Sequence, residues 1–241
     1  MNTEKLLDGL VTRFREAAGA NLESIILYGS AVGGDFRPGH SDLNMFCVLR
    51  DASFMALQAL EPAAKWWDGQ KQPAPLLMTL AEMERAADVF AIEWLDMRES
   101  HRVLYGADVL TKLQIPMRLH RFQVEYELRE KLVLLRQGFL LAGGSAKKLW
   151  DVTLRSAPSF STLFRHALIT LGETPPAAKA DAVRLLAKRA EFDPVAVIEV
   201  FDLRQREARP GDSDIKRICS QYLAAIEQVT AAVDRMMDSQ P

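Results

Sequence analysis

One glycine-rich segment near the N-terminus combines residue types that could bind a phosphate. Gly29 and Ser30 follow a short apolar run, and Asp42 and Asn44 come after a loop rich in glycine and proline. Glycine lacks the Cβ that would keep a phosphate away from the backbone, serine offers a hydroxyl, and free amides at a helix start attract anions. These features predict a pocket for a triphosphate.

The two polar residues after the loop are expected to act together. Asp42 and Asn44 are two apart on an expected strand, so both side chains project from the same face, toward the corner at Ser30. A different interpretation makes Gly29-Ser30 a plain tight turn and Ser41-Asp42 a turn or helix cap.

The whole segment, LYGSAVGGDFRPGHSDLN, resembles the signature of the nucleotidyltransferase superfamily. In that signature, Gly-Ser follows a strand, a glycine-rich loop comes next, and Ser-Asp-x-Asp lies on the second strand. The beginning of the segment, LYGSAVGG, is most similar to the aminoglycoside adenylyltransferases, which share their nucleotidyltransferase fold with DNA polymerase beta. The resemblance covers residues 20–50 with specificity.

The resemblance implies both a ligand and a reaction. The ligand is a nucleoside triphosphate with Mg²⁺, and the reaction transfers a nucleotidyl group to a hydroxyl of a small-molecule or protein acceptor. Asp42 and Asn44 then take the positions of the catalytic metal ligands. The residues implied in phosphate binding are Gly29, Ser30, Arg37 and Ser41, of which Arg37 is equally consistent with a solvated side chain.

The sequence departs from the family pattern at its acidic positions. Asn44 keeps an oxygen ligand but removes one negative charge, so metal affinity should fall. The apolar stretch 75–80 lacks the family's third acid and has only Thr79 as a polar residue. Glu93 and Asp96 are the nearest substitutes, but on the strand expected there they are three apart and point to opposite faces. Nucleotidyl transfer without these charges loses much of its electrostatic stabilisation.

Two functional hypotheses therefore stand side by side. The first is an active nucleotidyltransferase. The second is a catalytically inactive descendant that senses a nucleotide or contacts another protein, for example as an antitoxin-like partner. The sequence specifies neither the acceptor, the preferred base nor the oligomeric state.

Apolar periodicity outlines the elements that position this segment. The first part of the chain, residues 1–114, is expected to be an α+β domain with a mixed sheet. Its expected helices cover residues 3–18 and 53–67, and its expected strands cover residues 24–28, 42–49, 76–80 and 89–97.

The second part of the chain, residues 115–241, is expected to be an all-α helical bundle. Ser145 and Ser159 are expected N-caps, and Asp193-Pro194 is a specific helix-start signal. The helices are expected at residues 117–141, from Ser145 and from Ser159 onward, near 177–190, and at 195–206 and 213–237.

Composition narrows the class of protein. Hydrophobic residues make up 49% and charged residues 26% of the chain, which is typical of a globular protein. No apolar stretch is long enough to span a membrane and the N-terminus has no secretion signal, so the cytoplasm is the expected location. The net charge of −2 gives little support for nucleic-acid binding.

Other residue types with chemical potential are expected to be structural. Cys47 and Cys219 lie in apolar patterns and are expected to be buried reduced thiols. The four histidines, His101 among them, show no metal-binding spacing. The cationic residues of the second domain, which the resemblance places over the triphosphate, are better interpreted as solvated: Arg129, Lys131, Lys147 and Lys148.

Overall fold

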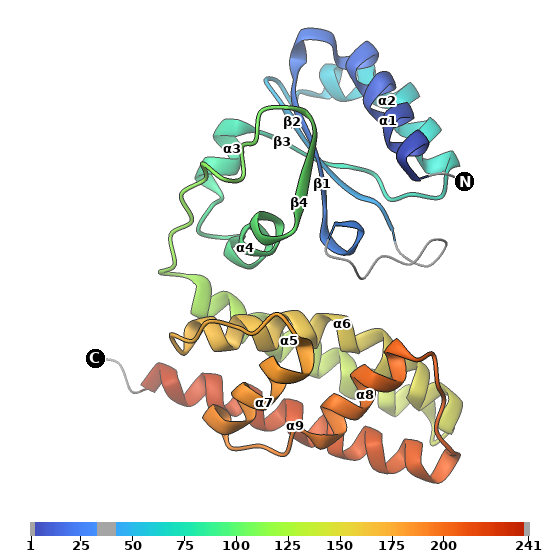
Figure 1. Cartoon of the computed structure of the whole chain (residues 1–241), viewed down its shortest axis with the longest axis vertical. Helices are drawn as coiled ribbons and strands as arrows, with labels where there is room; N and C mark the ends of the chain where they lie inside the picture. Colours follow the sequence, from blue (N-terminus) through green and yellow to red (C-terminus); the bar gives the residue numbers. More distant parts are fainter. Residues whose placement is uncertain (1–2, 33–41, 239–241) are drawn as a thin grey trace. The chain divides into compact units, whose positions relative to one another are not determined.

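The computed structural model describes residues 3–32 and 42–238 of the 241-residue chain. The chain divides into two compact units, Met1–Leu119 and His120–Pro241 (Figure 1). The first unit contains a sheet with helices, whereas the regular elements among the described residues of the second unit are all helices. The fold class expected from the sequence, α+β followed by an all-α bundle, is confirmed.

The sheet of the first unit has four strands in the order β3-β2-β1-β4. These strands are β1 (Leu22–Tyr28), β2 (Asn44–Leu49), β3 (Leu76–Thr79) and β4 (His101–Gly106). Strand β1 is antiparallel to both β2 and β4, and β2 is parallel to β3. The sheet is therefore mixed, and β1 and β2 form its buried centre.

Helices cover both faces of this sheet, as Figure 1 shows. On one face lie α1 (Thr3–Ala18) and α2 (Phe54–Gly69), and on the other lie α3 (Leu80–Arg85) and α4 (Ala91–Glu99). Successive residues of β1 and β2 alternate between the two faces because side chains of a strand point to opposite sides. The chain thereby builds two separate hydrophobic cores around one sheet.

The expected fourth strand at residues 89–97 is wrong, because this segment contains helix α4. Its buried residues Trp94 and Met97 are three apart, as on one face of a helix, and pack into the core on the sheet. The actual fourth strand, β4, follows immediately and contains no fully buried residue. Because Glu93 and Asp96 belong to a helix, they are not on opposite faces of a strand.

The second unit consists of long helices packed side by side. They are α5 (His120–Ala142), α6 (Ala146–Thr170), α7 (Lys179–Ala190), α8 (Val195–Gln205) and α9 (Asp212–Asp238). Helix α6 packs against α5, α7 and α9 and forms the centre of the bundle. None of the helices in the described residues is both long and apolar enough to cross a lipid bilayer.

Two of the three expected helix starts in this unit are confirmed. The Ser145 hydroxyl accepts a hydrogen bond from the Lys148 amide at the start of α6, and Asp193 accepts one from the Val195 amide at the start of α8. The expected N-cap at Ser159 is wrong, since Ser159 lies inside α6. Helix α6 continues through Pro158 because its buried face runs on without interruption on both sides.

Candidate functional site

Three strands meet at the edge of the sheet where the glycine-rich segment leaves β1. Tyr28, the last residue of β1, pairs with Asn44 at the start of β2 and with His101 at the start of β4. Residues paired across antiparallel strands project to the same face. Tyr28 packs against the core under α4, so all three side chains belong to that face. Burial raises the pKa of Tyr28, which favours its protonated phenol.

The chain turns sharply after Tyr28. Gly29 has a φ of +79°, a left-handed conformation that side chains with a Cβ rarely adopt. Its amide donates a hydrogen bond of 3.1 Å to the carbonyl of Ser100, so it is not available to a ligand. The neighbouring Ser30 differs, because neither its amide nor its hydroxyl has a partner among the residues described. We call Gly29 and Ser30 the corner.

Asn44, the first residue of β2, lies beside this corner, and Asp42 comes two residues before it. A Cβ added to Gly29 would be 3.5 Å from Nδ2 of Asn44, so the Asn44 amide lies directly against the corner. Asp42 is exposed and has no partner in the described part of the chain. The structure thus brings Gly29, Ser30 and Asn44 together. The other two expected phosphate-binding residues, Arg37 and Ser41, lie outside the described residues.

A glutamine that the sequence analysis did not single out anchors this segment. The side-chain oxygen of Gln72 accepts a hydrogen bond of 2.8 Å from the amide of Leu43. Leu43 is buried in the core under α1 and α2, between Asp42 and Asn44 in the chain. Gln72 therefore helps to fix the backbone that carries both polar side chains.

Strand β3 contributes no carboxylate to this edge. It begins at Leu76, which pairs with Phe46, and its polar residue Thr79 lies at the other end of the sheet. The Thr79 hydroxyl caps α3 in a reciprocal pair with Glu82. Hydrogen bonds from the Thr79 backbone and hydroxyl lower the pKa of Glu82. The Thr79 hydroxyl is therefore bound at the start of α3, at the opposite end of the sheet from the corner.

Of the two acids that the sequence suggested as substitutes, Glu93 and Asp96, Asp96 is connected to the corner through the backbone. Its carbonyl accepts a hydrogen bond of 3.1 Å from the amide of Ser100, whose own carbonyl binds Gly29. The Asp96 side chain is half-buried, whereas Glu93 is exposed. Both acids already interact with other residues.

A histidine and an aspartate also meet at this edge. Nε2 of His101 lies 3.1 Å from Oδ2 of Asp108, and Nδ1 lies 3.2 Å from the carbonyl oxygen of Arg98. Partial burial raises the pKa of Asp108, but hydrogen bonds from His101 and the Thr111 amide outweigh it and leave the pKa below its ordinary value. The register of β4 could have revealed this pair, but β4 was not recognised from the sequence.

No metal cluster accompanies the corner in the described residues. Within residues 3–32 and 42–238, no three side chains of histidine, cysteine, aspartate or glutamate are arranged to hold a metal ion. Both cysteines are buried free thiols, as expected. Burial raises the pKa of Cys47 to about 12, so this thiol stays protonated.

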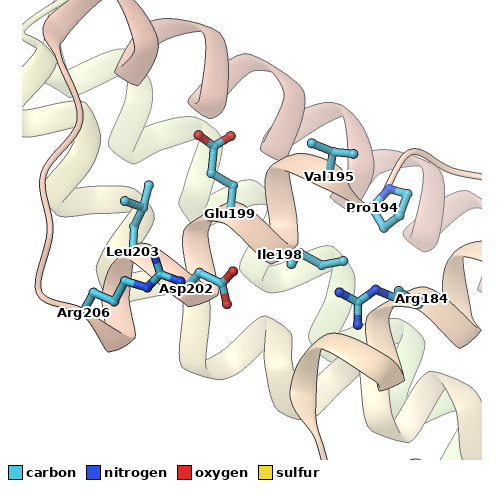
Figure 2. Close-up of a pocket in the computed structure, with 8 residues that line it drawn as sticks. All are labelled: Arg184, Pro194, Val195, Ile198, Glu199, Asp202, Leu203 and Arg206. Atoms are coloured by element: carbon cyan, nitrogen blue, oxygen red, sulfur yellow. The ribbon is translucent and has the colours of Figure 1, made fainter.

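The helical unit has a cavity of its own, of about 650 Å³, which Figure 2 shows. It lies along α8, with one arginine from α7 at its side. Its lining residues are Arg184, Pro194, Val195, Ile198, Glu199, Asp202, Leu203 and Arg206. None of these residues belongs to the site expected from the sequence, so the cavity and the corner share no residue.

The two cations of α5 named from the sequence, Arg129 and Lys131, form ion pairs with acids. Arg129 contacts Glu125 and Asp234, and Lys131 contacts Glu127 and Glu130. The hydrogen bonds that Arg129 donates to Glu125 and Asp234 raise its pKa. These pairs fit the interpretation that the cations lie on a solvated helix face.

Comparison with known proteins shows similarity in structure but not in sequence. No protein-family model matches the chain, and no curated protein matches it. The chain is similar in structure to spectinomycin adenyltransferase AAD(9) from Enterococcus faecialis, whose crystal structure was determined with ATP and spectinomycin. The TM-score is 0.58 at 16% identity, over 97% of this chain and 100% of that chain. At this identity the similarity establishes the fold alone, which this chain shares with that adenyltransferase.

Proposed function

We propose that this chain binds a nucleoside triphosphate, with its phosphates at the corner formed by Gly29 and Ser30. The observation that carries the proposal is that the amide and the hydroxyl of Ser30 have no partner among the described residues. Ser30 directly follows Gly29, whose left-handed turn lies against Asn44. Both groups of Ser30 donate hydrogen bonds and suit phosphate oxygens. The absence of a Cβ at Gly29 leaves room for a phosphate to approach the backbone.

The residues of β2 suit a magnesium ion that arrives with the nucleotide. Mg²⁺ in phosphate-transferring sites is held by one or two carboxylates together with phosphate oxygens and water. Asp42 supplies one exposed carboxylate, and Asn44 adds a neutral amide oxygen. Bound there, the ion would neutralise charge on the phosphates. Arg37 and Ser41, which lie outside the described residues, are proposed from the sequence as further phosphate ligands.

The reaction that this arrangement favours is transfer of a nucleotidyl group to a hydroxyl. The acceptor oxygen forms a bond to the α-phosphorus, the bond to the bridging oxygen breaks, and pyrophosphate leaves with its electron pair. The acceptor proton passes to a base or to water. The corner would hold the phosphates in line for this displacement, and Asp42 supplies an exposed acid two residues before the start of β2.

The second candidate function is nucleotide binding without transfer. Two observations favour it: the amide at Asn44 in place of a carboxylate, and the absence of any acid in β3. A site with one carboxylate binds a metal more weakly and lacks an evident base for the acceptor. The chain would then respond to a nucleotide or pass the signal to a protein partner.

Isothermal titration with ATP, with and without Mg²⁺, tests the binding proposal. We expect Ser30→Ala to weaken ATP binding about tenfold, the effect of losing one hydrogen bond to a charged group. Ser53→Ala is the matched control, because the Ser53 hydroxyl caps α2 in the same unit. Absence of ATP binding by the wild type, or equal effects of both variants, would refute the proposal.

A pyrophosphate-release assay separates the two candidate functions. The assay would use ATP, Mg²⁺ and a panel of hydroxyl-bearing acceptors, with spectinomycin as one member. Release that requires both an acceptor and Asp42 supports transfer. Tight ATP binding without release supports the second candidate, and Asn44→Asp should then tighten Mg²⁺ binding without producing turnover.

A further inference from the structure

The imidazole of His101 bridges two hydrogen-bond acceptors. Nδ1 faces the Arg98 carbonyl at 3.2 Å and Nε2 faces the Asp108 carboxylate at 3.1 Å. A ring with a proton on each nitrogen donates to both acceptors, whereas a neutral ring donates to only one. The side chain of His101 is only 12% exposed, so these two bonds fix it in place.

Asp108 is itself held by the fold. Its second carboxylate oxygen accepts hydrogen bonds from the amides of Leu110 and Thr111, at 3.1 and 3.2 Å. Leu110 is buried in the core under α3 and α4. Asp108 is therefore an anchored support, and the His101 ring connects this support to the end of α4.

The same backbone carries the acceptor for the corner. Ser100, directly before His101, accepts the Gly29 amide through its carbonyl and donates its own amide to Asp96. His101 is also the cross-strand partner of Tyr28, the residue directly before Gly29. A shift of His101 would therefore move the carbonyl that holds the corner.

We propose that the His101–Asp108 pair is a positioning clasp that fixes the corner for a phosphate. The pair lies next to the corner and holds the Ser100 carbonyl where it binds Gly29, which directs the amide and the hydroxyl of Ser30 toward the ligand. The clasp acts through geometry and makes no contact with the reacting atoms. The inference rests on the proposed nucleotide site, and neither residue was assigned a function from the sequence.

One conservative substitution distinguishes whether the clasp acts through its hydrogen bonds or through the negative charge of Asp108. In Asp108→Asn, Oδ1 can still accept from the Leu110 and Thr111 amides, and Nδ2 can donate to Nε2 of His101. The neutral ring with its proton on Nδ1 then keeps its bond to the Arg98 carbonyl. Every hydrogen bond of the clasp survives in this variant, whereas Asp108→Ala removes the support.

Amide hydrogen exchange of Gly29 in the nucleotide-free protein tests the clasp directly. We expect His101→Ala and Asp108→Ala each to accelerate Gly29 exchange about tenfold, with the double variant no faster, because both break one unit. The Ile26 amide, deeper in β1, should exchange as in the wild type. The matched control is Arg102→Ala, which removes an ion pair with Glu4 from the neighbouring residue of β4.

ATP titration of the same variants supplies the functional result. We expect His101→Ala and Asp108→Ala to bind ATP about tenfold more weakly, and Asp108→Asn and Arg102→Ala to bind as the wild type does. Unchanged Gly29 exchange in both alanine variants would overturn the clasp. Weak ATP binding by Asp108→Asn with Gly29 still protected would also overturn it, since charge would then matter. Failure of the wild type to bind ATP would refute the proposed function, while the exchange results would still decide on the clasp.

Discussion

Replacing Gly29 with alanine should separate the stability of the corner from its ligand binding. The residue adopts a φ of +79°, which costs an alanine about 1–2 kcal/mol, partly offset by about 0.4–1 kcal/mol of lost unfolded-state entropy. The nearest heavy atom to the new methyl would be Nδ2 of Asn44 at 3.5 Å, an ordinary van der Waals contact. We therefore expect the free energy of unfolding to fall by only about 1 kcal/mol.

Ligand binding should suffer more than stability. The added methyl would occupy the space between the backbone and an approaching phosphate, so we expect ATP affinity to fall about tenfold or more. Gly19→Ala is the control, since Gly19 also has a positive φ, +54°, and no atom within 4 Å of an added Cβ. Urea denaturation and ATP titration measure the two effects. Equal ATP affinity in Gly29→Ala and Gly19→Ala would refute this reasoning about the corner.

Three further predictions concern the metal, the sheet and a thiol. Asn44→Asp should tighten Mg²⁺ binding to the ATP complex about tenfold by restoring a negative charge, measured by titration of Mg²⁺ at fixed ATP; an unchanged affinity would remove Asn44 from the metal site. Gly106→Ala should lower the free energy of unfolding by more than about 3 kcal/mol in urea denaturation, because its Cβ would lie 1.9 Å from the Glu23 carbonyl oxygen; a loss as small as that of Gly19→Ala would contradict this. Burial raises the pKa of Cys47 to about 12, so the thiolate is scarce below that pH and native Cys47 should resist alkylation at pH 8 until urea unfolds the protein; rapid labelling of the native protein would show that the thiol is accessible.

The central strands and most helices could be predicted because their sequence patterns have one interpretation. The apolar run into Gly29, the run from Asn44 to Leu49 and the amphipathic helix after Ser53 agree with the structure to within two residues. The segment VFAIEWLDM, residues 89–97, was ambiguous, because a short apolar run fits a buried strand and a helix equally well. Its packing on the sheet selects the helix. Strand β4 escaped notice because its partly exposed residues give no alternation.

The proximity of the corner to Asn44 was predictable from the sequence, whereas the contacts that depend on strand pairing were not. That these residues form a ligand site stays a prediction. Gly29, Ser30 and Asn44 are close in the chain, and the structure brings them together. The contributions of Ser100 and His101 depend on the register between β1 and β4, which no local pattern encodes. The wrong assignment of residues 89–97 to a strand hid the pairing of β4 with β1. A strand there would have ended before Ser100 and His101.

Because β1 runs opposite to both of its neighbours, its last residue meets the first residues of two strands that are far apart in the chain. The corner is consequently a junction of three separate peptides, of which the glycine-rich motif supplies only two. If that motif alone were grafted onto another scaffold, its sequence would be transferred without the Ser100 carbonyl, which restrains Gly29. Evolution can likewise alter this junction by substitutions near residue 100 that leave the motif itself untouched.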